Sequence, residues 1–188
     1  NERADQAWAL KEPRLCLLLP IFRSILSKPS AIIVVRHPAE VARSLRRRNG
    51  FPIAVGMALW EAYMCSALHY SVDLDHLIVS YDEIIDNPKR LFDELFEWFA
   101  ERNVSGLDAA AAAETISPGL RRERSQPEDD NLLTETQKTL WERLSARQVA
   151  EPRPRLSQRA REVLQEFEAD QALIERLRAQ ITSQGTKL

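Results

Sequence analysis

A continuous apolar run over residues 31–35 ends at a charged residue and is followed by a proline, and this segment constrains the fold more than any other. A run without polar alternation predicts a strand buried on both faces of a parallel sheet. Pro38 suits the first turn of a helix, where its missing N–H costs nothing. The segment therefore predicts a strand followed directly by a helix, with Arg36 at the carboxyl end of the strand.

At that position Arg36 would face the amino end of the next helix, where open parallel sheets bind ligands and where anions are favoured. The helix carries Ser44, and a guanidinium with a nearby hydroxyl is typical of a phosphate site. A structural interpretation also exists, in which Arg36 caps carbonyl groups and Ser44 bonds back to its own helix. We favour the phosphate, because a charge that ends a buried strand is costly without an anionic partner.

The charges of the 188-residue chain nearly cancel, since 26 basic and 28 acidic residues give a net charge of −2. This balance argues against broad nucleic-acid affinity. Five arginines fall between positions 36 and 48, and for Arg43, Arg46 and Arg47 we favour a solvated helix face.

No apolar run reaches the roughly 18 residues of a membrane span. Two distant cysteines and three scattered histidines predict neither a disulfide framework nor a metal site, and a cytoplasmic location is expected.

A second apolar run over 76–81 extends the pattern to a parallel α/β fold, because a long helix over about 53–72 separates it from the first strand. Further helices are expected over 15–26, about 39–48, from Asp86 onward, 109–113 and 134–148, with a loop over 117–130. The expected organisation is an α/β core over 1–103, a helical and loop extension over 104–154, and an amphipathic helix over 155–188.

The last segment carries a seam at alternating spacings of four and three residues, with one polar member, Asp170. The seam positions are Leu156, Ala160, Val163, Phe167, Asp170, Ile174, Leu177 and Ile181. A heptad seam is typical of a coiled coil, which would join two copies of the chain or space further domains through 155–181. An amphipathic helix packed on its own domain would show the same pattern, and both interpretations stay open.

Arg36 and Ser44, eight residues apart across a strand, a turn and a helix, resemble the pair that holds the cofactor's 3′-phosphate in the sulfotransferases that use 3′-phosphoadenosine 5′-phosphosulfate. Arg48, four residues after Ser44, is similar to a second arginine that meets the same phosphate in the tyrosylprotein branch. The segment 80–88, SYDEIIDNP, resembles a family segment whose tyrosine, here Tyr81, also contacts the cofactor. A simpler role for Tyr81 is as a core residue beside the second strand.

The segment 11–14, KEPR, is similar to the Lys-Asp-Pro element of tyrosylprotein and many bacterial sulfotransferases. The resemblance implies that Lys11 is the catalytic cation beside the bridging oxygen and offers Glu12 as the base for the acceptor hydroxyl. Lys11 could equally be a surface lysine. Glu12 could orient Lys11 or pair with Arg14 instead.

The resemblance spans about residues 8–100, roughly half of the chain. It implies a parallel sheet of the P-loop nucleotide-binding, sulfotransferase-like type. It also implies transfer of a sulfuryl group from 3′-phosphoadenosine 5′-phosphosulfate, without a metal, to a carbohydrate, peptide tyrosine or small alcohol. Sulfuryl transfer resembles phosphoryl transfer, in which the protein mainly positions groups and stabilises charge.

The chain departs from the family at its first element, a strand and a Gly/Ser/Thr-containing loop that binds the 5′-phosphosulfate. Residues 1–10 contain no glycine, so we expect a C-terminal portion of a longer protein that is inactive alone. Two other functions stay open. One is a non-catalytic interaction module with a coiled coil, and the other is a different P-loop nucleotide enzyme, which would need a glycine-rich Lys-Ser/Thr loop and an acidic metal ligand.

Overall fold

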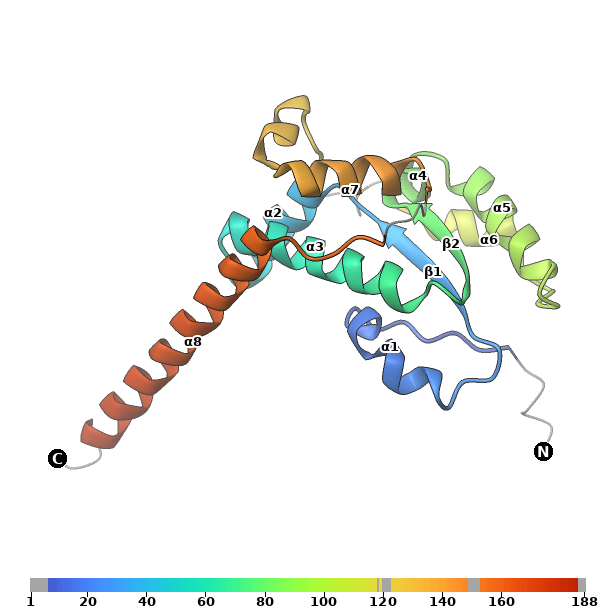
Figure 1. Ribbon diagram of the computed structural model, residues 1–188. Coiled ribbons are helices and arrows are strands. Elements are labelled where there is room, and N and C mark those ends of the chain that lie inside the picture. The colour runs from blue at the N-terminus through green and yellow to red at the C-terminus, as the bar shows by residue number, and fades with distance from the viewer. Residues whose placement is uncertain (1–6, 118, 120–122, 149–152, 186–188) are drawn as a thin grey trace.

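The computed structural model describes residues 7–117, 119, 123–148 and 153–185, and it is a mixed α/β arrangement of helices around a small parallel sheet (Figure 1). In chain order the elements are α1 (Leu15–Arg23), β1 (Ser30–Val35), α2 (Pro38–Asn49), α3 (Ile53–Tyr70), β2 (Asp75–Ser80), α4 (Tyr81–Asp86), α5 (Pro88–Ala100), α6 (Ala109–Glu114), the 3-10 helix η2 (Pro127–Leu132), α7 (Glu135–Ser145) and α8 (Gln158–Gly185).

The sheet consists of β1 and β2, which pair in parallel from Ser30 opposite Asp75 to Val35 opposite Ser80. The expected parallel pairing, with α2 and α3 between the two strands, is confirmed. The expected burial of β1 on both faces is wrong. Ile33 and Val35 are buried, whereas Ile32 and Val34 are 41% and 47% exposed. Successive side chains of a strand point to opposite faces, and among the described residues only one face of β1 is well covered.

The helix α2 is fixed at the carboxyl end of β1 by its caps and by close packing on α3. The ring nitrogen Nδ1 of His37 accepts a hydrogen bond from the backbone N–H of Ala39 at 3.2 Å, and Pro38 opens the helix as expected. Gly50 ends it in the left-handed conformation, with φ of 74°. A Cβ added at Gly56 would lie 2.6 Å from the Cα of Ala42, so α2 and α3 cross almost backbone to backbone.

The segment after residue 104 contributes to the same core as the sheet. Leu140 and Leu144 of α7 belong to one buried cluster with Ile33 and Val35. A buried carboxylate ties the last helices to α3, since Glu61, with no exposed surface, accepts hydrogen bonds from Gln137 Nε2 at 3.0 Å and from the backbone N–H of Ser157 at 2.6 Å. The extension expected over 104–154 therefore contributes, through α7, to the same hydrophobic core as the sheet.

The second strand ends one residue earlier than the sequence predicts. Tyr81 opens the short helix α4, because the Ser80 hydroxyl accepts a hydrogen bond from the backbone N–H of Asp82 at 3.2 Å and caps that helix.

In the part of the chain that the structure describes, no single helix is long and apolar enough to cross a membrane. The bent pair α2 and α3, at 120°, meets that test only when the two helices are taken together, by length and composition.

Candidate anion site at the carboxyl end of β1

Arg36 directly follows β1, and its side chain is 19% exposed. Its guanidinium carbon lies 4.4 Å from the centre of the Tyr81 ring, in the geometry of a cation–π contact. The pairing of Val35 with Ser80 explains this contact, because the residues that follow them leave the sheet side by side. The structure thus brings together two of the residues that the sequence pattern selects.

Arg36 has an anionic partner inside the protein, Glu40. Arg36 Nε donates to Glu40 Oε2 at 2.7 Å, and Arg36 Nη2 donates to the backbone carbonyl of Glu123 at 3.1 Å. Glu40 is fully buried, and its other oxygen accepts a hydrogen bond from the backbone N–H of Ser125 at 2.6 Å. Glu40 is not among the residues that the sequence pattern selects. Its signal was present, because an acid in the first turn of a helix, four residues after an arginine, suits both the helix dipole and an ion pair.

Residues 123–130, called here the acidic strap, run across α2 and engage its arginines. Asp129 accepts two hydrogen bonds from Arg43, at 2.7 and 2.9 Å, and the carboxylate of Glu123 pairs with Arg47. The hydrogen bond from Arg43 lowers the pKa of Asp129 below its ordinary value. A solvated helix face was favoured for Arg43 and Arg47, but both pair with the strap, and only Arg46 of that set is exposed without such a pair among the described residues.

Ser44 and Arg48 follow Glu40 at intervals of four residues along α2 and so share one helix face. Ser44 is partly buried, whereas Arg48 is exposed and donates from Nε to the side chain of Asn49 at 2.9 Å. Within the described residues, no hydrogen bond joins either of them to Arg36. Arg36, just before α2, and Glu40, Ser44 and Arg48 on α2 therefore form a row at four-residue spacing, with Glu40 between Arg36 and Ser44. The convergence of Arg36, Ser44 and Arg48 on one anion stays a prediction.

Lys11 and Glu12 lie apart from this row. Glu12 Oε1 accepts hydrogen bonds from Arg14 Nε at 2.8 Å and from the Arg14 backbone N–H at 3.1 Å, and the hydrogen bond from the Arg14 side chain lowers the pKa of Glu12. This local pair is one of the alternatives that the sequence offered. Lys11 is exposed. No hydrogen bond or ion pair among the described residues links this segment to Arg36, Ser44 or Tyr81.

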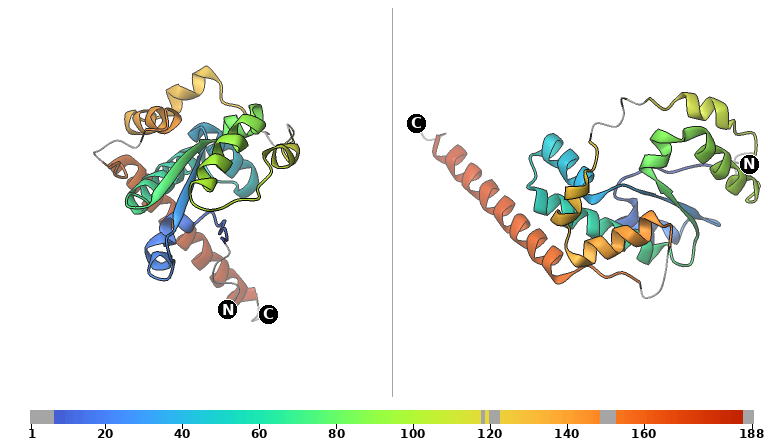
Figure 2. Two further views of the ribbon diagram at one scale, coloured as in Figure 1. Left: turned by 90° about the vertical axis from the view of Figure 1, so that its right-hand side faces the viewer. Right: turned by 90° about the horizontal axis from the view of Figure 1, so that it is seen from above.

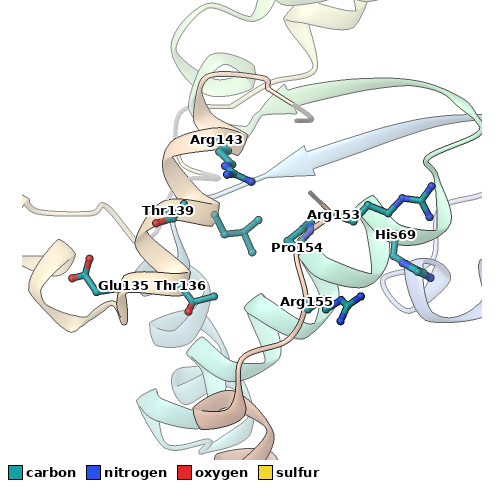
Figure 3. Close-up of a pocket in the computed structure, with 9 residues that line it drawn as sticks. His69, Glu135, Thr136, Thr139, Arg143, Arg153, Pro154 and Arg155 are labelled. Atoms are coloured by element: carbon teal, nitrogen blue, oxygen red, sulfur yellow. The ribbon is translucent and has the colours of Figure 1, made fainter. Parts of the chain in front are cut away.

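A separate cavity of about 900 Å³ lies between α7 and the chain that leads into α8 (Figure 3). It is lined by His69, Glu135, Thr136, Thr139, Leu140, Arg143, Arg153, Pro154 and Arg155. It contains none of the residues that the sequence pattern selects. In Figure 3 the side chain of Arg143 points across the cavity, whereas those of Arg153, Arg155 and His69 point to one side, so these four basic groups do not converge on a single point.

Among the described residues, no group of three or more His, Cys, Asp or Glu side chains is placed to hold a metal ion. Both cysteines are free thiols, and burial, assisted by the nearby Glu61 charge, raises the pKa of Cys65 to about 12. A scan against protein-family models, a search of curated proteins and a search of solved structures each give no match to this chain.

Proposed function

We propose that this chain is the 3′-phosphate-binding portion of a sulfotransferase that uses 3′-phosphoadenosine 5′-phosphosulfate, built on a sheet of the P-loop nucleotide-binding type. One observation carries the proposal: Arg36 and Tyr81 stack at the carboxyl ends of two neighbouring parallel strands, beside the amino end of α2. Strand ends and helix N-termini of this kind bind nucleotide phosphates. The residues around them follow the order of the family pattern.

In this proposal the phosphate lies along the row on α2. Arg36 supplies guanidinium N–H groups beyond the two that contact Glu40 and Glu123, because an arginine has five such donors. The Ser44 hydroxyl donates a further hydrogen bond, and Arg48 adds positive charge one turn later. Tyr81 fixes the plane of the Arg36 guanidinium and offers a ring beside the nucleotide.

The exposed face of β1 supports a further covering layer in a longer protein. Ile32 and Val34 expose apolar side chains there, and apolar strand faces are normally covered in parallel sheets. The resemblance would set the 5′-phosphosulfate loop in that missing layer, near Lys11 as the catalytic cation and Glu12 as the base. The acceptor would be a hydroxyl compound and the location cytoplasmic. The 188-residue chain alone would then bind nucleotide weakly and transfer no sulfuryl group.

An interaction module without catalysis is the second candidate, and one observation favours it. The charge of Arg36 is already compensated by Glu40, and the strap compensates Arg43 and Arg47. In this alternative, the arginines paired with carboxylates have the single role of anchoring the acidic strap on α2, and no nucleotide binds.

The test is the binding of adenosine 3′,5′-bisphosphate, measured by calorimetry on the longer parent protein. We expect Arg36→Ala to weaken binding by about 1.5–3 kcal/mol, the loss typical of a charge-assisted hydrogen bond. Ser44→Ala, which leaves the Arg36–Glu40 pair intact, should weaken it by about 1 kcal/mol. Arg46→Ala is the matched control on the exposed side of α2 and should bind as the unaltered protein does.

Unchanged affinity in both the Arg36 and the Ser44 variants would remove these residues from a nucleotide site. A transfer assay with labelled sulfate separates the two candidate functions. The parent should label at least one of a panel of sugar, tyrosyl-peptide and phenolic acceptors, and the 188-residue chain should label none. Absence of both nucleotide binding and transfer in the parent would favour the interaction module.

A further inference from the structure

The helix α8 begins on the body of the molecule and then projects away from it (Figures 1 and 2). Its first turns pack on α3, where Ala160 is 2% exposed and the ring of Phe167 meets the ring of Phe51 edge-on at 5.1 Å between centroids. Beyond Phe167, residues 168–179 are all exposed. The helix therefore has one part that packs on the body and one part, residues 168–179, whose side chains are all exposed.

The apolar seam runs through both parts without a change of spacing. Its first part is the surface that α8 already uses against the body, and its second part presents Ile174 and Leu177, which are 39% and 49% exposed, with Leu173 beside them at 55%. A strict alternation of four and three residues keeps an apolar stripe on one side only when a helix winds around another helix. The projecting part thus continues an existing helix–helix seam and needs a second helix.

The charges of the projecting part select the identical helix of a second copy, in antiparallel orientation. In order they are Glu168, Asp170, Glu175, Arg176 and Arg178. The first half is acidic and both arginines lie in the second half, so antiparallel pairing sets opposite charges together, whereas parallel pairing in register would set Asp170 against itself. A register with Ile174 opposite Leu177 of the other copy places Asp170 within one turn of the other copy's Arg178.

We propose that residues 168–181 of α8 join two copies of this chain as an antiparallel coiled coil. The projection of α8 makes room for it, because antiparallel helices place the two bodies at opposite ends of the pair (Figure 1). The candidate anion site lies on the body and stays open in each copy. This inference does not depend on the proposed sulfotransferase function.

Sedimentation equilibrium of the full chain tests the pairing. We expect a monomer–dimer equilibrium whose dissociation constant rises by about tenfold or more in Ile174→Asp, because a charge would be buried in the seam. Ala172→Asp adds the same charge on the opposite side of α8 and should leave the constant unchanged. Asp170→Leu should tighten the dimer, because it replaces the one polar residue of the seam. Circular dichroism checks that each variant keeps its helices.

The orientation is tested by exchanging charges. Arg178→Asp should weaken the dimer, and adding Asp170→Arg to it should restore the affinity, which parallel pairing could not do because equal charges would then face each other. A chain that stays monomeric at all concentrations, or equal effects of Ile174→Asp and Ala172→Asp, would overturn the proposal. A dimer that the exchanged variant does not restore would overturn the antiparallel arrangement.

Discussion

The carboxyl end of β1 and the segment around Lys11 carry the two halves of one sequence pattern, yet they differ in almost every physical respect. At the strand end, Arg36 is largely buried, stacks on Tyr81 and pairs with the buried carboxylate of Glu40. Around Lys11, the side chains are mostly exposed, and the ion pair that the described residues form there joins Glu12 and Arg14, which are close in sequence. The arrangement at the strand end is held by tertiary contacts, whereas the arrangement around Lys11 is held by contacts between residues close in sequence.

This difference indicates which of the two ion pairs contributes to stability. An ion pair that is cut off from water holds its groups in one geometry, because the loss of either partner leaves an uncompensated charge. An exposed pair contributes little, because water and salt screen it. The side chain of Arg36 at the strand end is therefore held in one geometry, as the proposed phosphate site would require, whereas Lys11 and Glu12 would need further contacts to fix their positions.

The largest expected effect is on the buried pair. Glu40→Ala should lower the free energy of unfolding by about 3 kcal/mol, because Arg36 and the Ser125 N–H both lose their acceptor in a buried place. Urea unfolding followed by circular dichroism measures it. Glu40→Gln is the matched variant, which keeps a side-chain oxygen for Ser125 and should lose less. A change as small as that of a surface mutation would show that the strand end is not held by this pair.

The next effect is a pH dependence at the acidic strap. The folded pKa of Asp129 is below 3.8, its ordinary value, so the stability that it contributes is fully present above that pH and is lost as the pH falls through the lower folded value. We expect thermal unfolding scans from about pH 6 to pH 2 to show that the unfolding temperature depends less on pH for Asp129→Asn than for the unaltered chain.

The control for the strap is Asp93, which pairs with Lys89 on the surface of α5 at 3.1 Å. Asp93→Asn should leave the profile unchanged, because both side chains of this pair are exposed. An identical pH dependence in the Asp129 variant and the unaltered chain would contradict the role assigned to the Arg43–Asp129 pair.

The smallest effect is expected at the amino-terminal segment. Glu12→Ala should not measurably move the urea midpoint, because the pair with Arg14 is exposed and local. Under the proposed sulfotransferase function, by contrast, the same variant and Lys11→Ala should reduce sulfuryl transfer in a transfer assay with labelled sulfate. A stability loss comparable to that of Glu40→Ala would remove the contrast between the two regions.

Several elements of the fold could be predicted from local sequence. The apolar runs predict both strands, Pro38 and Gly50 bound α2, and the helical periodicities predict α3, α5 and α7 to within a few residues. The short helix α4 was missed because its start depends on a single hydroxyl cap at Ser80. Both strands lie in a parallel pair because the helices between them supply the crossover that parallel strands need.

The candidate site shows the limit of such reasoning. Residue type and spacing selected Arg36 and Ser44, because a strand end and a helix face are local features, and the resemblance to the sulfotransferases added Arg48 and Tyr81. These patterns could not show that Glu40 is the buried partner of Arg36. Nor could they show that a strap nearly ninety residues later engages Arg43, because that contact joins positions 43 and 129 across a separation of 86.

The sequence by itself determined the two strands and the helices α2, α3, α5 and α7, where Arg36 leaves β1, and that α8 carries one continuous heptad seam, since periodicity, proline and glycine act over a few residues. Only the tertiary structure decided which charges are buried and paired, which face of β1 is left exposed, and at which turn α8 leaves the body. These properties depend on which distant surfaces meet, because burial and dielectric environment belong to the packed arrangement and not to any one stretch of chain.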